Sequence, residues 1–162
     1  MSGYRGPELL DAAHDVADFD CGDEALNEWL RRRAPRNQRE GSSRMWVVVH
    51  GADVVGFYAS STAVVARIEA TRRASRNQPD PLPAMLLGRL AVDRAHQGRG
   101  LAAAMLKHFL HKALEVAALT GVRLVLVHAK DAQAAGLYRR FGFEPSPIDD
   151  LTLMLLTKDI EP

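Results

Sequence analysis

A glycine-rich turn between a strand and a long helix is the feature that most narrows how this 162-residue chain can fold. Residues 86–92 are expected to form a strand, and four residues separate it from the segment Gln97-Gly98-Arg99-Gly100-Leu101-Ala102. Glycine allows a sharp turn and a close approach of the backbone to a ligand, and the first amides of a helix have no partner within it. The turn therefore predicts N–H groups that converge on a phosphate, although a glycine-rich helix start without a ligand would use the same residues.

The helix that begins after this turn carries an apolar stripe. Between Leu101 and Ala117, apolar residues recur at spacings of three and four, which predicts one buried helix face. The opposite, exposed face is expected to carry Lys107, His108, His111, Lys112 and Glu115. Thr120-Gly121 ends the helix, and residues 122–129 supply a Val- and Leu-rich run typical of a strand covered on both faces. Strand, helix and strand in this order imply a crossover connection.

The first third of the chain predicts two short helices and a hairpin. Asp23 is expected to cap a helix through residues 25–30, and Pro35 to open a second helical piece. Residues 45–49 and 54–58 have the composition of strands and are joined by a tight turn, which predicts a β-hairpin.

The remaining segments complete a mixed α/β sheet. Residues 66–83 combine four Arg and three Pro with little apolar periodicity, so we expect a loop or partly helical insertion there. Asp131 can cap a helix over residues 132–140, and residues 151–157 offer one more strand. Without a repeat or an interdomain linker, these elements predict a single domain spanning residues 1–162.

The composition excludes several classes of protein. The hydrophobic fraction of 47% and the charged fraction of 25% are those of a soluble globular domain, and no apolar run approaches the roughly 18 residues that a membrane span needs. The N-terminus lacks the basic and apolar segments of a secretory signal, so we expect a cytoplasmic protein. The single cysteine, Cys21, cannot form an internal disulfide and lies among acidic residues, which favours a packed thiol over a reactive one.

The net charge of +1 conceals two basic segments. Together they hold ten of the 21 Lys and Arg residues: Arg31, Arg32, Arg33, Arg36, Arg39, Arg44, Arg67, Arg72, Arg73 and Arg76. Residues 1–28, by contrast, carry eight acids and one arginine. If the two segments meet in space, they could follow a phosphate backbone. Charge alone leaves open the alternative of two separately solvated polar faces.

Two motifs resemble those of the GNAT acetyltransferases. Gln97, Gly100 and Ala102 match the pattern Q-x-x-G-x-[GA], which binds the coenzyme pyrophosphate in that family, with Ala rather than Gly at the last position. The second pattern, N-x-x-A-x-x-x-Y-x-x-x-G-F, is matched at Asp131, Ala134, Tyr138, Gly142 and Phe143. Asp stands there in place of the usual Asn. The resemblance implies the GNAT fold, a mixed and mostly antiparallel central sheet flanked by helices, with acetyl-CoA as co-substrate.

Flanking segments narrow the resemblance to the toxin branch of the GNAT family. Residues 19–22, 87–93 and 143–147, which read FDCG, LGRLAVD and FEPSP, are similar to that branch, and the likeness spans residues 7–160. It implies acetyl transfer from acetyl-CoA to the α-amine of an aminoacyl-tRNA, which blocks translation. It also implies a ribbon-helix-helix antitoxin and a second copy of the chain, in a homodimer, as partners.

The same resemblance assigns roles to residues. Tyr138 is the candidate proton donor to the departing CoA thiolate, because a pKa of about 10 keeps a tyrosine protonated at neutral pH. Without the motif, a tyrosine packed on the core with its hydroxyl in water would be the simpler interpretation. Coenzyme-binding residues are expected to be Leu90, Ala91, Val92, Gln97, Gly98, Arg99, Gly100, Leu101, Ala102, Asp131 and Ala134. Contacts with tRNA are expected from Arg31, Arg32, Arg33, Arg36, Arg39, Arg72, Arg73 and Arg76.

No side chain stands out as a general base, and an α-amine with a pKa of about 8 hardly requires one. Asp93, His96 and His128 could assist, yet a turn, a solvent-facing loop and a strand end explain them as well. His108 and His111 come without an H-E-x-x-H motif or a cysteine cluster, so we expect no metal. Two other functions stay open at this point: acetylation of a small amine or a protein N-terminus, and a non-catalytic binding module with the same fold.

Overall fold

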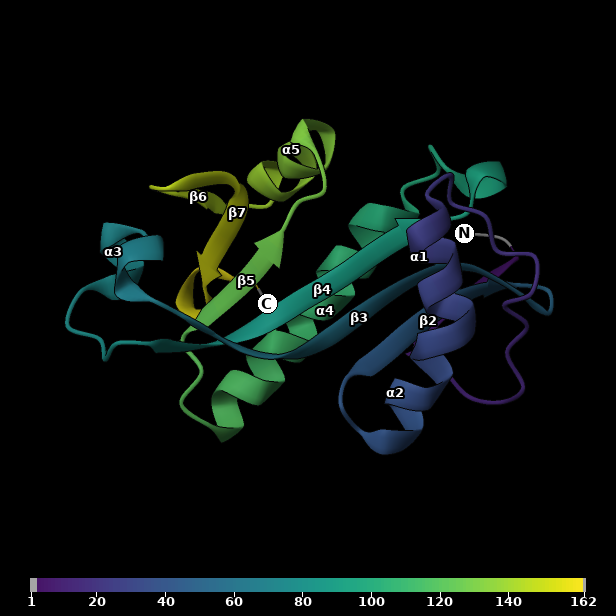
Figure 1. Cartoon of the computed structure of the whole chain (residues 1–162), viewed down its shortest axis with the longest axis horizontal. Helices are drawn as coiled ribbons and strands as arrows, with labels where there is room; N and C mark the ends of the chain where they lie inside the picture. The colour runs from purple at the N-terminus through teal and green to yellow at the C-terminus, as the bar shows by residue number, and fades with distance from the viewer. Residues whose placement is uncertain (1–2, 162) are drawn as a thin grey trace. The chain divides into compact units, whose positions relative to one another are not determined.

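The structure, a computed structural model, describes residues 3–161 and combines strands with helices (Figure 1). The strands are β1 (Tyr4–Leu9), β2 (Arg44–His50), β3 (Asp53–Val65), β4 (Leu82–Val92), β5 (Leu124–His128), β6 (Glu144–Ser146) and β7 (Asp149–Leu156). The α-helices are α1 (Glu24–Glu28), α2 (Ala34–Glu40), α3 (Arg72–Ser75), α4 (Leu101–Leu119) and α5 (Ala132–Arg140). A π-helical stretch, η1 (Trp29–Arg33), joins α1 to α2, and short 3₁₀ turns are η2 (Arg67–Glu69), η3 (Arg94–His96) and η4 (Thr157–Asp159).

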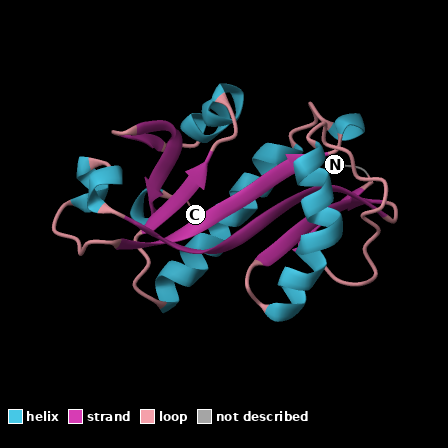
Figure 2. Cartoon of the chain, in the orientation of Figure 1, coloured by secondary structure: helices cyan, strands magenta, loops and turns pink. Residues whose placement is uncertain are grey.

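The described strands, drawn in magenta in Figure 2, form one sheet. They are hydrogen-bonded in the order β1-β2-β3-β4-β5-β7-β6. Strands β4 and β5 are parallel and are connected along the chain through α4, whereas β1–β2, β2–β3, β5–β7 and β6–β7 are antiparallel. The predicted fold, a mixed and mostly antiparallel sheet with flanking helices, is confirmed, and so is the predicted crossover.

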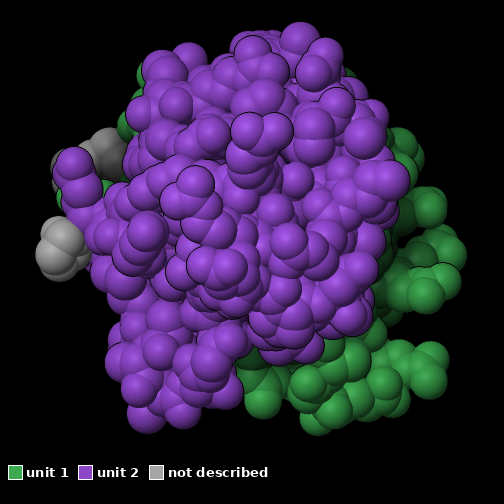
Figure 3. All heavy atoms as spheres, turned by 90° about the vertical axis from the view of Figure 1, so that its left-hand side faces the viewer, with its two compact units in different colours: residues 1–61, 88–108 green, residues 62–87, 109–162 purple. Residues whose placement is uncertain are grey.

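The chain divides into two compact units (Figure 3). Unit 1 comprises Met1–Ser61 and Gly88–His108, and unit 2 comprises Thr62–Leu87 and Phe109–Pro162. Strands β3 and β4 and helix α4 each contribute one part to unit 1 and the rest to unit 2. The division thus follows no linker, and the single domain expected over residues 1–162 stays a prediction.

Unit 1 is built around the hairpin of β2 and β3. Its turn places Gly51 at a φ of +66°, a conformation that glycine adopts without steric cost. Asp23 caps α1 by accepting hydrogen bonds from two amides of the first turn, as the sequence predicts. The buried rings of Phe19 and Phe57 meet edge to face in the core cluster that α1 and η1 cover.

Unit 2 has its core around β5 and β7. Residues 124–127 of β5 are buried throughout, as expected of a strand covered on both faces. Ala74 of α3 and Leu82 of β4 pack in one cluster with Leu124 and Met154. Residues 66–83 are partly helical, as the sequence suggests, because η2 and α3 interrupt the loop. Arg72 and Arg73 therefore lie in a short helix that the buried side chain of Ala74 anchors.

Helix α4 confirms the apolar stripe. Its buried residues include Leu101, Met105, Leu106, Phe109, Leu110 and Ala113. The expected exposure of the opposite face is wrong for His108, whose Nδ1 lies 2.7 Å from the Tyr58 hydroxyl and whose ring meets Trp46 edge-on. His108 lies between the buried residues Leu106 and Phe109 of the same helix, so its side chain borders the buried face rather than opposing it.

Two strands and parts of two others escaped the sequence analysis. Strand β4 begins at Leu82, although the sequence predicted a loop up to residue 83 and a strand from Leu86. Strand β1 contains Gly6-Pro7 and little apolar alternation, yet its backbone pairs with β2. It stands at one end of the strand order, and proline is tolerated in such an edge strand. Strand β6 has only three residues. Strand β3 continues past Tyr58 through the polar run Ser60-Ser61-Thr62, because backbone pairing does not depend on apolar side chains.

Candidate functional site

The turn between β4 and α4 is held in unit 1 by two of its own side chains. The Asp93 carboxylate caps η3 and also accepts a hydrogen bond from the Asp20 amide at 3.0 Å. Gln97 Nε2 donates to the carbonyl oxygens of Val92 at 2.9 Å and Cys21 at 3.2 Å. These bonds tie the turn to the end of β4 and to the loop before α1. Asp93 therefore has the structural turn role that the sequence left open.

The glycines of the turn leave space beside their backbones. Gly98 and Gly100 adopt φ values of +79° and +81°, which side chains disfavour. A Cβ atom built on either residue would meet no atom of the described chain within 4 Å. The need for glycine is therefore conformational, and the open space allows a ligand to approach the backbone.

The start of α4 presents unused amides next to these glycines. The first helical hydrogen bond runs from Ala104 N to the Gly100 carbonyl oxygen at 3.0 Å, so the amides of residues 101–103 precede the hydrogen-bond ladder. None of these three amides is bonded to another residue within 3–161. No acidic side chain in the first turn offsets the partial positive charge of the helix end. This combination suits a bound phosphate.

The residues predicted to face the acetyl thioester lie at the end of β4. Pairing between β4 and β5 covers Ala84–Leu87 and Leu124–Val127, and β4 continues beyond it to Val92. Residues 90–92 thus belong to a part of the strand outside this pairing. Strand β3 still flanks β4 on its other side, so the backbone groups directed toward β5 are the ones that can bond to a ligand instead of a strand.

Tyr138 lies in α5 of unit 2. The Asp131 carboxylate caps this helix by accepting from the Ala134 amide at 2.8 Å, so the first half of the second motif encodes a helix start. Tyr138 is only 6% exposed, and its ring packs 5.8 Å from that of Phe143. Burial raises the pKa of Tyr138 to about 12, which holds the proton on the hydroxyl at neutral pH. Within the described residues this hydroxyl has no hydrogen-bond partner, so it can donate to a bound group.

The sequence analysis missed a cluster that joins β1 to the turn. Tyr4 Oη lies 2.7 Å from His96 Nδ1, and Arg99 Nη1 donates to the same oxygen at 3.1 Å. The rings of Tyr4, His50 and His96 have centroids 5.1–5.5 Å apart. The solvent-facing position considered for His96 is wrong, because its ring is half-buried in this cluster. The contact spans 92 residues, and no local pattern indicates it.

The basic residues of segment 31–44 fall into two groups. Arg31 pairs with Glu24 at 2.9 Å, and Arg36 pairs with Glu40 at 3.2 Å. Four exposed arginines have no ion pair to any described residue: Arg32, Arg33, Arg39 and Arg44. Of these, Arg44 donates to the Gln38 carbonyl oxygen at 3.2 Å. Three of the five arginines that the sequence assigned to tRNA in this segment are therefore available to an outside anion.

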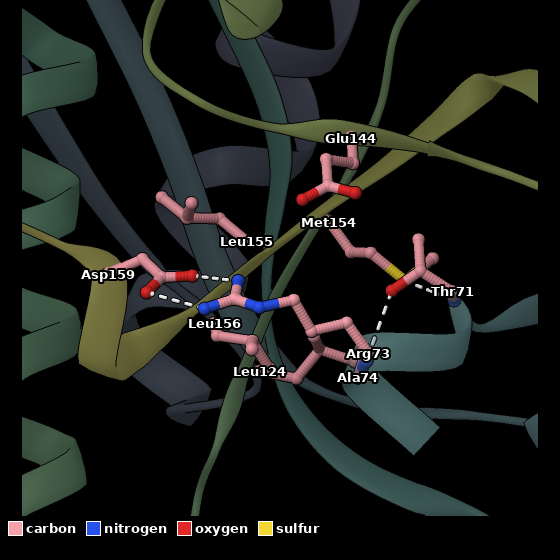
Figure 4. A pocket seen from close by; sticks show the side chains of 9 residues that line it. All are labelled: Thr71, Arg73, Ala74, Leu124, Glu144, Met154, Leu155, Leu156 and Asp159. Atoms are coloured by element: carbon pink, nitrogen blue, oxygen red, sulfur yellow. Dashed lines mark hydrogen bonds and ion pairs between the residues drawn. The ribbon is translucent and has the colours of Figure 1, made fainter. Parts of the chain in front are cut away.

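The second basic segment shows the same division. Arg73 forms two hydrogen bonds with Asp159, which raise the pKa of Arg73 and lower that of Asp159 (Figure 4). Arg72 and Arg76 have no such pairing within residues 3–161. A cavity of about 510 Å³ is lined by Thr71, Arg72, Arg73, Arg76, Arg123, Glu144 and Lys158. Five cations and one carboxylate make it basic, and the sequence analysis did not single out Arg123 or Lys158.

Other candidate roles find little support in the described residues. The Nδ1 atom of His128 lies 3.2 Å from Thr152 Oγ1, which is the strand-end contact considered from the sequence. Residues 3–161 contain no group of three or more His, Cys, Asp or Glu side chains arranged to hold a metal ion. In the same part of the chain, no helix has the length and apolarity needed to cross a bilayer.

Comparison with known proteins identifies the family. Residues 41–145 match the acetyltransferase (GNAT) domain. The chain belongs to the GNAT acetyltransferases. Over 159 residues, this GNAT chain is 45% identical to a tRNA-acetylating toxin of Mycobacterium tuberculosis (strain ATCC 25618 / H37Rv), and the match covers 98% of the chain and 96% of the relative.

Solved structures agree with this assignment. AtaT complexed with acetyl-methionyl-tRNAfMet is 29% identical, with a TM-score of 0.86 over 93% of the GNAT chain and 94% of AtaT. A mutant AtaT toxin bound to the C-terminus of the antitoxin AtaR and to acetyl-CoA is 30% identical, with a TM-score of 0.79 over 95% and 94% of the two chains. The resemblance inferred from two motifs is thus confirmed, together with the acetyltransferase class and acetyl-CoA as donor. The roles of individual GNAT site residues stay predictions.

Proposed function

We propose that this GNAT acetyltransferase is a toxin that transfers the acetyl group of acetyl-CoA to the α-amine of an aminoacyl-tRNA and thereby blocks translation. The observation that carries the proposal is the 45% identity to a tRNA-acetylating toxin over 98% of the chain. The likeness to AtaT, solved with acetyl-methionyl-tRNAfMet, supports the same class of substrate.

The turn after β4 is the proposed site for the pyrophosphate of acetyl-CoA. Open space beside Gly98 and Gly100 suits a close approach, and the unused amides of residues 101–103 suit the negative charge. Gln97 holds the shape of the turn through its own bonds to backbone carbonyls. The amides of residues 90–92 would bind the pantetheine and polarise the thioester carbonyl.

The chemistry needs few side chains. The amine nitrogen attacks the thioester carbon, the carbon–sulfur bond breaks, and the proton lost by the amine balances the one gained by sulfur. Tyr138 is proposed to donate to that sulfur as its charge develops. A pKa of about 12 makes complete proton transfer from Tyr138 to the departing thiolate unfavourable, because the conjugate thiol has an ordinary pKa near 8.5. The hydrogen bond itself is therefore the main contribution. Water then delivers the proton.

The acceptor side is proposed to use the arginines that lack internal partners. In unit 1 these are Arg32, Arg33 and Arg39, and in unit 2 they are Arg72 and Arg76. Guanidinium groups bind phosphates through paired N–H donors, and a small-molecule amine substrate would not need several of them. Arg31, Arg36 and Arg73 are already paired with carboxylates, which makes them weaker candidates than the sequence suggests.

Further proposals concern partners and compartment. A ribbon-helix-helix antitoxin is proposed as the inhibitor, because a related toxin was solved with the C-terminus of its antitoxin.

We also infer a homodimer and a cytoplasmic location, where aminoacyl-tRNA is found. Light scattering on the purified chain at several concentrations measures the oligomeric state, and a monomer at all of them would refute the dimer.

The decisive experiment measures transfer of labelled acetyl from acetyl-CoA to a pool of charged tRNA, with deacylated tRNA and amino acids as controls. Label on charged tRNA alone is the expected result, and it should disappear after the aminoacyl ester is hydrolysed. Label on amino acids or peptides but never on tRNA would replace the proposal with a small-amine or N-terminal acetyltransferase. Binding of acetyl-CoA without any transfer would favour a non-catalytic module.

A further inference from the structure

An aromatic and cationic stack stands on the surface of unit 1. The indole of Trp29 in η1 stacks on the fully buried ring of Phe57, with centroids 5.9 Å apart and planes at 16°. The guanidinium of Arg89 in β4 lies over the same indole, with its Cζ atom 4.2 Å from the ring centroid. Phe57 is interior, Trp29 is half-buried and Arg89 is exposed, so the stack leads from the core to a flat cation at the surface.

The charge of this stack is not neutralised within the described chain. Partial burial, and secondly the nearby guanidinium of Arg33, lower the pKa of Arg89. Neither guanidinium forms an ion pair or a hydrogen bond with any residue of 3–161. Arg31, two residues before Arg33, does find a carboxylate. Two neighbouring cations without an acid between them repel each other, and an outside anion would relieve that repulsion.

The stack also lies close in sequence to the proposed thioester site. Arg89 directly precedes residues 90–92, and a rise of about 3.3 Å per residue places its Cα within about 10 Å of theirs. In an aminoacyl-tRNA, four bonds separate the reacting amine nitrogen from the ribose carbon of the terminal nucleotide, a span of about 5 Å. An amine that reaches the thioester therefore brings the terminal nucleotide within range of the Arg89 side chain.

We propose that Trp29 and Arg89 form a subsite for the 3′-terminal nucleotide of the aminoacyl-tRNA, with the Arg89 guanidinium as a stacking platform for the base and Arg33 beside it for a phosphate. A guanidinium plane can both stack on a base and pair with a phosphate, whereas an ammonium group can pair with a phosphate but cannot stack. Trp29 acts as a positioning residue, because its indole holds the guanidinium in place. This inference rests on the proposed function and adds residues to its acceptor side.

The test compares Arg89→Ala and Arg89→Lys with wild type on two substrates, full aminoacyl-tRNA and a 3′-aminoacylated CCA trinucleotide. Stacking on a base predicts that Arg89→Ala raises KM about tenfold for both substrates, with the KM for acetyl-CoA unchanged. Arg89→Lys keeps the charge but loses the plane, so it should recover little of that loss. The exposed Arg5→Ala variant of the same unit is the matched control, and thermal unfolding checks that every variant folds.

The two substrates separate the possible outcomes. A loss with full tRNA but not with the trinucleotide would overturn the subsite, because the contact would then lie elsewhere on the RNA. Full recovery by Arg89→Lys would overturn the stacking role. If wild type acetylates neither substrate, the proposed function fails first, and that result is distinct from either failure of the subsite.

Discussion

The turn after β4 and the two basic segments make different demands on the sequence. The turn is built from backbone: two glycines with positive φ, three unused amides, and the Gln97 side chain that fixes them. The basic segments are built from side chains, and their available charge depends on which carboxylate each arginine meets. Arg36 and Arg73 are paired while Arg72 and Arg76 are not, although all four looked alike in the sequence.

The difference between a site built from backbone and one built from side chains shows which kind of site a sequence motif can reveal. A backbone site needs particular residue types in a fixed order, so its pattern is visible in one chain. A charged surface can be built from arginines in many different sequence orders, and an internal ion pair can neutralise any one of them. Experiments on the two regions should therefore give unlike results: large and localised effects at the turn and at Tyr138, and smaller, salt-dependent effects at the arginines.

The largest effect is expected at Tyr138. Tyr138→Phe removes only the hydroxyl that is proposed to donate to the leaving sulfur, so kcat should fall about 100-fold or more, while the Kd for acetyl-CoA stays within about twofold. Single-turnover acetylation and equilibrium titration with acetyl-CoA measure the two quantities. Tyr58→Phe is the matched control, because Tyr58 is also buried but contacts His108 instead. Equal losses in both variants would remove Tyr138 from the chemistry.

The next largest effect is expected at the turn. Gly100→Val forces a β-branched residue to a φ of +81° and adds atoms beside the proposed pyrophosphate site, so the Kd for acetyl-CoA should rise at least about tenfold. Gly51→Val is the control, since Gly51 has a φ of +66° and similarly open surroundings but lies in the β2–β3 turn. Both variants should lose about 1–3 kcal/mol of unfolding free energy. Unchanged coenzyme affinity in Gly100→Val would contradict the assignment of the turn.

Smaller effects are expected at the arginines, and pairing should decide which variants show them. The double substitution Arg72→Gln with Arg76→Gln should raise the KM for aminoacyl-tRNA several-fold at low salt. It should also reduce the slope of log KM against log salt by about two, because two phosphate contacts are lost. Arg36→Gln, which breaks only an exposed ion pair, should leave KM and slope nearly unchanged. If the double variant and Arg36→Gln behave alike, the internal pairing does not govern RNA binding.

Much of the fold was predictable from local chemistry. The caps at Asp23 and Asp131, the hairpin turn at Gly51 and the stripe on α4 depend on residues within a few positions of each other. Strand β1 was not predictable in this way, because its sequence lacks alternation and it is held by backbone pairing with a distant strand. The same reason explains why β3 was expected to end near Tyr58 rather than at Val65.

For the candidate site, the sequence indicated the turn and Tyr138 but not what surrounds them. The raised pKa of Tyr138 follows from burial in the packed unit, which a motif does not report. The stack of Arg89 on Trp29 joins residues 60 positions apart, and the contact of Tyr4 with His96 joins residues 92 apart. Contacts of such separation have no signature in a single sequence, because only folding brings the partners together.

The smallest effect is expected where β1 meets the turn. The Tyr4 hydroxyl bonds to both His96 and Arg99, so Tyr4→Phe should loosen the turn and raise the KM for acetyl-CoA about threefold without changing kcat. If Tyr4 acts by holding Arg99, the same substitution should have no effect on KM in an Arg99→Ala background. Additive losses in that double-mutant cycle would instead assign the effect to His96, and an unchanged KM in Tyr4→Phe alone would show that the turn keeps its shape without β1. The size of the Tyr4→Phe effect thus measures how far the turn after β4, which is built from backbone, depends on side chains from elsewhere in its unit.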